Sequence, residues 1–296
     1  MNVNYFFKEE KMEYRTLNNG IEMPVLGFGT FTLEPADCEE LVAEALKEGY
    51  RLIDTANMYK NEKAVGRAIR KSKVNREEIF ITTKLWPTSF PYEKASKEID
   101  ETLKRLGTDY IDLLLLHQEV GDIEGAWKAC EEAVKSKKVK SIGISNFSTE
   151  SIDKLLAHAS IKPAVLQNEC HPYLQEKRLR EYLQKNDIRL MSWYPLGHGD
   201  ASLISNPVFT EIGKKYNKTS AQAILRWHIE SGIIAIPCTR NISHLSENID
   251  VFDFELSDED MKTISDINRN KRYFKMPMFV KQIAFTRGNI NFNDQV

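Results

Sequence analysis

The sequence predicts an α/β protein, a (β/α)8 (TIM) barrel with an N-terminal β-hairpin and a short C-terminal tail. Short apolar segments alternate with segments of helical periodicity eight times, and no Pro/Gly/Ser-rich linker interrupts them. Strands that alternate with helices pair in parallel through right-handed crossovers. A length of 296 residues fits one barrel or two smaller domains. The unbroken alternation favours one domain over residues 1–296.

The N-terminal segment predicts a hairpin rather than a nucleotide-binding turn. Residues 1–12 read as a flexible tail, and Met12 is a second candidate start. Asn18-Asn19-Gly20 separates two alternating segments, a pattern typical of a tight hairpin. The first barrel strand is expected at 23–30, where Gly27-Phe28-Gly29 lacks the third glycine of a dinucleotide fingerprint. A closed barrel is therefore favoured over an open nucleotide-binding sheet.

The remaining strands are short apolar runs, and the helices are stretches with apolar residues every three or four positions. Glycine at 49 and 107 ends two of the helices, as a left-handed cap does. Strands are expected at 52–56, 79–85, 110–116, 139–145, 164–170, 189–194 and 232–237. Helices are expected at 37–48, 62–71, 92–106, 123–135, 149–158, 176–185, 208–216, 220–230 and 258–267.

Composition lowers the expectation of several classes of partner. Lys and Arg number 41 against 43 Asp and Glu, a net charge of −2 that offers no field for nucleic acid or an anionic membrane. No apolar run approaches the ~18 residues of a membrane span, and the N-terminus does not resemble a signal peptide. The four cysteines are widely spaced, which argues against a disulfide framework. We therefore expect a cytoplasmic protein without a membrane or nucleic-acid partner.

Ionisable residues stand at the ends of successive predicted strands, where the active sites of such barrels are built. Asp54 ends the second strand, Tyr59 follows it, Lys84 ends the third and His117 follows the fourth. Each alone has an ordinary explanation as a helix cap, a packed ring or a solvated charge. Because their strands are neighbours, all four should converge on one rim. That convergence favours a catalytic site.

The chemistry of this set is that of a tuned proton donor. A free tyrosine has a pKa of about 10, too high to exchange protons readily at neutral pH. An ammonium ~4 Å away favours the phenolate by up to roughly 4 kcal/mol at an effective dielectric near 20. We therefore expect Lys84 to lower the pKa of Tyr59, with Asp54 orienting Lys84 and cancelling part of its field. His117 is placed to polarise a carbonyl oxygen.

Several blocks resemble those of the aldo-keto reductase family, in the right order and over nearly the whole chain. They are Asp54-Thr55-Ala56-x-x-Tyr59-x-Asn61-Glu62, Lys84-Leu85-Trp86, Tyr110 through His117, and Lys140 through Phe147. The resemblance implies an NADP(H)-dependent alcohol dehydrogenase or carbonyl reductase that works as a monomer. Hydride from the nicotinamide reduces an aldehyde or ketone, and Tyr59 gives the proton to oxygen. Asp54, Lys84 and His117 complete the catalytic set.

The resemblance also implies binding residues. Ser145, Asn146 and Gln167 would bind the carboxamide, and Trp193 would stack on the nicotinamide where many members have Tyr. The other expected cofactor contacts are Gly29, Thr30, Phe31, Asp54, Tyr194, Pro195, Leu196, Thr239, Arg240, His244, Glu247 and Asn248. The expected substrate contacts are Phe31, Tyr59, Trp86 and His117.

Two departures from the family pattern bear on specificity. Cys238 and His244 stand where the family usually has the cations that meet the 2′-phosphate, and Thr239 and Arg240 are the remaining candidates, Arg240 because a guanidinium suits bidentate phosphate contact. NADPH is the first choice of cofactor, and NADH use stays open. After His117 the chain enters the next helix almost at once, and Glu119 adds a carboxylate there. We expect an open pocket lined by Phe31, Trp86 and the tail 271–296.

Two other classes of function are weighed. A non-catalytic cofactor-binding or sensor protein on the same scaffold is the alternative, and it is disfavoured because all four catalytic positions are present. A metal-dependent hydrolase needs clustered ligands, and the six histidines show no HxH or HExxH spacing. The sequence thus predicts no metal site and a small carbonyl compound as substrate.

Overall fold

The computed structural model describes residues 12–296; the predicted tail at 1–12 lies outside this range except for Met12, which packs against the core. Eight strands of the described chain form one parallel sheet in sequential order. Its edges meet through a parallel bridge between Leu26 and Ala235, so the sheet closes into the predicted barrel. The strands are β3 (Phe28–Gly29), β4 (Leu52–Asp54), β5 (Phe80–Leu85), β6 (Ile111–Leu116), β7 (Val139–Ser145), β8 (Val165–Glu169), β9 (Arg189–Trp193) and β10 (Ile234–Ala235).

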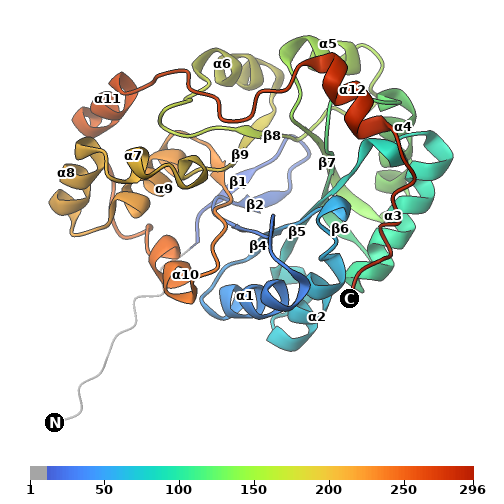
Figure 1. Cartoon of the computed structure of the whole chain (residues 1–296), viewed down its shortest axis with the longest axis horizontal. Helices are drawn as coiled ribbons and strands as arrows, with labels where there is room; N and C mark the ends of the chain where they lie inside the picture. Colours follow the sequence, from blue (N-terminus) through green and yellow to red (C-terminus); the bar gives the residue numbers. More distant parts are fainter. Residues whose placement is uncertain (1–11) are drawn as a thin grey trace.

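Helices surround the sheet, as Figure 1 shows. Those between successive strands are α1 (Pro35–Lys47), α2 (Glu62–Ser72), α3 (Tyr92–Leu106), α4 (Ile123–Lys135), α5 (Thr149–Leu156), α6 (Lys177–Asn186), α7 (Ala201–Ile204), α8 (Pro207–Tyr216) and α9 (Ser220–Glu230). After β10 come α10 (Ile242–Ile249), α11 (Asp258–Asp266) and α12 (Met278–Thr286). No helix in the described range is long and apolar enough to cross a membrane.

The predicted hairpin is confirmed and covers the amino-terminal end of the barrel. Its strands β1 (Tyr14–Thr16) and β2 (Glu22–Pro24) pair antiparallel. Asn18 Nδ2 donates to the carbonyl of Pro163, just before β8, and Arg189 at the start of β9 donates to Thr16. Leu17 joins the apolar cluster inside the barrel. The hairpin therefore does not cover the opposite end of the barrel, at the carboxyl ends of the strands, where the site is expected.

The predicted first strand, 23–30, is shorter in the structure. The segment from Met23 to Pro24 belongs to the hairpin, and only Phe28–Gly29 pairs with β4. A side chain at Gly27 would lie 2.4 Å from Leu52, so a residue with a Cβ would not fit this approach to the barrel. Glycine therefore allows the chain to pass from hairpin to barrel wall.

Three helices fall where the sequence predicted none: α7, α10 and α12. The most consequential is α12, because the predicted C-terminal tail contains it. After α11 the chain crosses the carboxyl face of the barrel, forms α12 against the segments that follow β5 and β6, and ends near α2 and α3 (Figure 1).

Candidate active site

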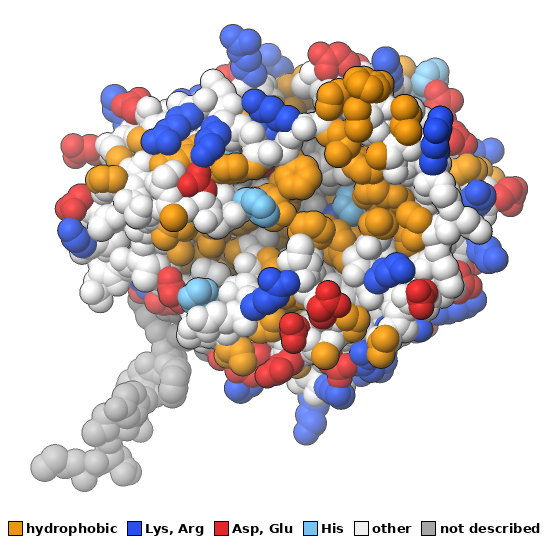
Figure 2. All heavy atoms as spheres, in the orientation of Figure 1, with side chains coloured by type: hydrophobic (Ala, Val, Ile, Leu, Met, Phe, Trp, Pro, Cys, Tyr) orange, Lys and Arg blue, Asp and Glu red, His pale blue; other side chains and the backbone are white. Residues whose placement is uncertain are grey.

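A cavity of about 810 Å³ opens at the carboxyl ends of the strands. Hydrophobic side chains gather around this hollow on the face shown in Figure 2. Among the predicted site residues, the cavity is lined by Gly29, Phe31, Asp54, Tyr59, Trp86, His117, Ser145, Asn146, Gln167, Trp193, Tyr194, Pro195, Leu196, Thr239 and Arg240. One concave surface thus brings together residues from most of the barrel strands.

The four predicted catalytic residues converge as expected. Asp54 ends β4, Tyr59 ends the one-turn helix η1 (Asn57–Tyr59), Lys84 lies in β5 and His117 follows β6. Lys84 Nζ lies 2.6 Å from Asp54 Oδ1 and 3.4 Å from the Tyr59 hydroxyl. The rings of Tyr59 and His117 meet edge to face with centroids 5.6 Å apart. A carbonyl oxygen placed between phenol and imidazole could contact both.

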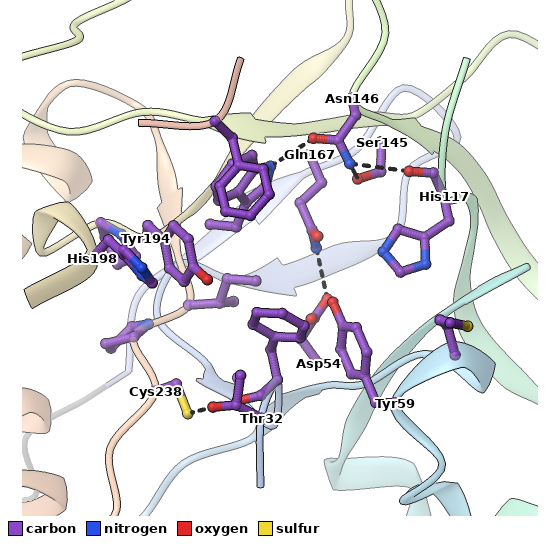
Figure 3. Close-up of a pocket in the computed structure, with 18 of the residues that line it drawn as sticks. Thr32, Asp54, Tyr59, His117, Ser145, Asn146, Gln167, Tyr194, His198 and Cys238 are labelled. Carbon is purple, nitrogen blue, oxygen red and sulfur yellow. Dashed lines mark hydrogen bonds between the residues drawn. The ribbon is translucent and has the colours of Figure 1, made fainter. Parts of the chain in front are cut away.

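Lys84 and Asp54 form an ion pair closed off from water. Their side chains are 0% and 3% exposed, and Lys84 Nζ also donates to the carbonyl of Thr55. Asp54 Oδ2 accepts from Gln167 Nε2 at 2.6 Å, a bond seen in Figure 3. Burial lowers the pKa of Lys84 and raises that of Asp54, while each charge favours the other. Each group therefore depends on the other to stay charged, and the hydrogen bonds to Thr55 and Gln167 fix the geometry of the pair.

The expected lowering of the Tyr59 pKa is wrong for this structure. Burial, followed by the Asp54 carboxylate, raises the pKa of Tyr59 well above its ordinary 10.0. Burial is the larger cause, and Lys84 does not offset it. Lys84 Nζ is 2.6 Å from Asp54 Oδ1 but 3.4 Å from the Tyr59 hydroxyl, so the Asp54 carboxylate cancels much of the field that would favour the phenolate. Tyr59 is accordingly a protonated donor at neutral pH.

His117 is a neutral imidazole in this environment. Burial, followed by the charge of Lys84, lowers its pKa well below the ordinary 6.5. Its backbone N–H donates to Leu85, and its Nδ1 has no partner within the described residues. The ring packs edge to face on Trp86 at 5.0 Å, which fixes its plane. A neutral, oriented imidazole can donate a hydrogen bond without adding charge.

A second group of side chains forms an amide network on the far side of the cavity (Figure 3). Asn146 Nδ2 donates to Ser145 Oγ and to the carbonyl of His117, each at 3.0 Å. Asn146 Oδ1 accepts from the indole of Trp193 at 3.1 Å. The left-handed backbone of Asn146, φ 61°, turns its side chain into this position. The predicted carboxamide contacts therefore lie together beside the predicted stacking residue.

Aromatic rings form one wall of the cavity. Tyr194 has φ 53° and packs on His198 with ring centroids 4.2 Å apart, and on Phe31 at 6.2 Å. Phe31 also lies 5.0 Å from the ring of Tyr59. A positive φ in a tyrosine is a strained backbone state. The strain holds this ring at the cavity wall rather than in the core.

The predicted residues of the adenosine end are more dispersed. Thr30 is buried behind the cavity and bonded to Asp54 and Asn61. His244 Nδ1 meets Thr239 Oγ1 at 3.3 Å, whereas Glu247 accepts from Thr219 and Asn248 is buried. None of these four predicted contacts (Thr30, His244, Glu247, Asn248) is among the cavity-lining residues. Lys84 likewise lies behind the surface, as its buried pair requires.

The side chains of Arg240 and Cys238, in the β10–α10 loop, form hydrogen bonds with the loop that follows β3. Arg240 NH2 donates to the carbonyl of Thr32 at 2.5 Å, and Cys238 Sγ donates to that of Phe31 at 3.4 Å. Both side chains are exposed at this edge of the cavity. Arg240 is therefore the guanidinium that lines the cavity.

The C-terminal segment supplies the wall that the short loop after His117 leaves out. Phe285 of α12 packs on Trp86 with centroids 4.8 Å apart, and Phe274 packs on Trp193 at 5.7 Å. As predicted, Phe31, Trp86 and residues of the tail line the cavity. The sequence predicted an open pocket, whereas in the structure the tail forms a helix that covers one side of it. Glu119 does not line this cavity.

Glu119 instead fastens α12 to the barrel. It accepts from Ser148 N at 2.8 Å and from Lys281 Nζ at 3.1 Å. Farther back, buried Glu169 accepts from the backbone of Tyr273 and Phe274 at 2.6 and 3.1 Å. Two carboxylates of the barrel thus hold the segment over the cavity.

Sequence reasoning missed several lining residues, among them Met58, Gln118 and His198. It also missed the helix that carries Phe285, for which a signal existed: Pro277 precedes Met278, and residues 281 and 285 are spaced to share one helix face. Within residues 12–296, no group of three or more His, Cys, Asp or Glu is arranged to hold a metal ion.

The structure thus places a buried acid–ammonium pair behind a phenol and an imidazole, in an aromatic cavity at the carboxyl end of a closed barrel. The family model described as the aldo/keto reductase family matches residues 25–269. The chain belongs to the aldo/keto reductase family, whose members use nicotinamide cofactors. The expected resemblance is confirmed.

Individual relatives support the same assignment. The chain is 44% identical to glyoxal reductase of Bacillus subtilis over 86% of this chain and 93% of that protein. It is 38% identical to methylglyoxal reductase DkgA of Escherichia coli over 86% and 94%. The crystal structure of MGS-M4, an aldo-keto reductase from a deep-sea metagenome, superposes with a TM-score of 0.87 at 42% identity, covering 93% of this chain and all of that one.

Proposed function

We propose that this protein reduces aldehydes or ketones to alcohols with NADPH, as an NADP(H)-dependent carbonyl reductase. The observation that supports this most strongly is the position of Tyr59 in the cavity, with its hydroxyl 3.4 Å from buried Lys84 and its ring edge to face with that of His117. Tyr59 gives its proton to the substrate oxygen, and His117 donates a hydrogen bond to the same oxygen. Lys84, kept charged by Asp54, stabilises the phenolate that remains.

The cavity fits a nicotinamide at its inner end. NADPH, when bound, supplies the hydride. Asn146 and Ser145 present amide and hydroxyl groups suited to a carboxamide, and Gln167 lies close through its bond to Asp54. Trp193, held by Asn146, offers an indole for stacking. These residues would orient the ring so that its reactive face meets the substrate beside Tyr59.

The substrate side favours small carbonyl compounds. Phe31, Trp86 and Phe285 surround the space next to Tyr59 and His117. Two relatives are named for glyoxal and methylglyoxal, so these compounds are the first to test. Steady-state rates with NADPH and NADH against aldehydes, ketones and keto-sugars would test the proposal. The absence of cofactor oxidation with every compound would contradict it.

We also propose that the enzyme acts as a monomer in a reducing compartment such as the cytoplasm. Asp54, Tyr59, Lys84 and His117 contact one another within one chain, so the proposed catalytic set needs no residue from a second copy. The four cysteines are free thiols, and Cys38, Cys130 and Cys170 are buried. Free thiols of this kind are typical of proteins kept under reducing conditions.

The pH dependence of reduction follows from two shifted groups. Activity needs Tyr59 protonated and His117 neutral, and their pKa values lie well above 10.0 and well below 6.5. The rate should fall only when pH rises through the first value or drops through the second. We expect kcat/KM for reduction to be level from about pH 7 to pH 9. A descending limb with its midpoint near pH 7 would show that Tyr59 is not the high-pKa donor described.

Arg240 should decide the preference for NADPH. Its guanidinium is exposed at the cavity edge and suits bidentate contact with a phosphate. Arg240→Ala should raise the KM for NADPH about tenfold, the value of one charge-assisted contact, and leave the KM for NADH nearly unchanged. Arg178→Ala is the matched control, since it removes an exposed guanidinium of α6 that is not among the residues lining the cavity. An equal rise for both cofactors would refute the assignment.

A further inference from the structure

The last residues of the described chain lie along α2 and α3, on the outside of the wall that carries Tyr59 (Figure 1). Phe292 is 5% exposed and anchors this segment. Gln295 accepts from Lys63 N at 3.1 Å with its side chain, and from Lys63 Nζ at 2.9 Å with its carbonyl. Asn293, between these two anchors, accepts from Arg105 NH1 at 2.7 Å through Oδ1.

Arg105 is a buried cation at the centre of a hydrogen-bond network. Its side chain is 2% exposed. Nε donates to Glu62 Oε2 at 2.6 Å, and NH2 donates to Glu98 Oε1 at 2.5 Å. Glu62 is itself fully buried. Two carboxylates, the Thr102 hydroxyl and one amide therefore fix the plane of the guanidinium, and Asn293 is the partner that comes from the C-terminal segment.

Both branches of this network lead to the proposed catalytic residues. Glu98 accepts from Asn57 Nδ2 at 3.2 Å, and Asn57 begins the one-turn helix that ends at Tyr59. Glu62 accepts from Thr83 Oγ1 at 2.6 Å, and Thr83 precedes Lys84 in β5. Arg105 thus connects the one-turn helix that carries Tyr59 to strand β5, which carries Lys84.

We propose that Asn293, acting through Arg105, is a positioning residue for Tyr59 and Lys84; its effect on turnover rests on the proposed reduction. A one-turn helix has little hydrogen bonding of its own, so its angle depends on the side chains that hold it. Loss of the Asn293 acceptor removes this partner from Arg105 NH1. The guanidinium then shifts, and with it the two chains of hydrogen bonds that run through Glu98 and through Glu62. A small displacement of the phenol then lowers the rate without changing the residues that bind ligands.

Asn293→Ala tests this while sparing the anchors at Phe292 and Gln295. We expect kcat to fall about tenfold, with KM and the Kd of NADPH nearly unchanged. A second readout needs no turnover: the ring-carbon NMR signal of Tyr59 in tyrosine-labelled protein, assigned with Tyr59→Phe, should shift or broaden. Asn293→Asp retains an oxygen acceptor for the guanidinium but loses the amide group that donates to Glu101 Oε2 at 3.0 Å. Combined with Glu101→Gln, which removes the like charge, it should restore both readouts.

Asn289→Ala is the matched control, because it makes the same substitution at an exposed asparagine of the same C-terminal segment and should leave kcat and the signal as in the wild type. A Tyr59 signal identical in wild type and Asn293→Ala would overturn the inference, and so would an unchanged kcat in an active enzyme. Wild-type protein that turns over no carbonyl compound would instead contradict the proposed function, and the NMR comparison would still decide the positioning role.

Discussion

Replacing Tyr59 by phenylalanine should lower reduction by about 100- to 10,000-fold, the usual contribution of a positioned general acid. The substitution removes the hydroxyl and keeps the ring, whose contacts with Phe31 and His117 hold it in place. Lys84 retains its bonds to Asp54 and Thr55. The loss should therefore appear in kcat rather than in folding or in cofactor binding.

The measurement is steady-state NADPH oxidation, with cofactor binding followed by quenching of tryptophan fluorescence. Tyr194→Phe is the matched control, because it removes a second hydroxyl from the same cavity and leaves the ring wall intact. Near-wild-type turnover by Tyr59→Phe would exclude Tyr59 as the proton donor.

Replacing Lys84 by methionine should impair both stability and catalysis. The change leaves the Asp54 carboxylate, 3% exposed, without its cation. Breaking a buried ion pair in this way costs about 3–5 kcal/mol of unfolding free energy. Turnover should fall as well, because the phenolate left by proton transfer loses its ammonium.

Urea unfolding and turnover of Lys84→Met should be compared with those of the double variant Asp54→Asn, Lys84→Met. Removing both charges abolishes the uncompensated carboxylate, so the double variant should regain most of the stability and none of the activity. If Lys84→Met unfolds at the wild-type urea concentration, the pair is not the buried, mutually dependent unit described above.

Much of the fold follows from local sequence patterns. The predicted bounds of α3, α4, β7 and α9 agree with the structure to the residue. These elements have strong amphipathic or apolar periods and clear ends, such as the glycine cap at 107 and the capping box at Thr219. The four proposed catalytic residues could be predicted for a related reason. Parallel strands place their carboxyl ends together, whatever the loops do.

Other features depend on contacts between distant residues. Helix α12 has exposed apolar side chains such as Phe279, and it takes its place through Phe285 on Trp86 and Lys281 on Glu119. The direction of the Tyr59 pKa shift could not be predicted either, because spacing shows that a lysine is near but not how deeply the phenol is buried, and burial is the main cause of the raised pKa. The role proposed for Asn293 depends on a pairing with Arg105 across 188 positions.

Transfer of deuterium from NADPH labelled at the reactive C4 position to methylglyoxal tests the central claim most directly. The alcohol is isolated after turnover and analysed by mass spectrometry and NMR. The account predicts one deuterium on the carbinol carbon for each cofactor oxidised, and loss of this product in Tyr59→Phe. A protein that binds NADPH but forms no deuterated alcohol from methylglyoxal or any other carbonyl compound would contradict it.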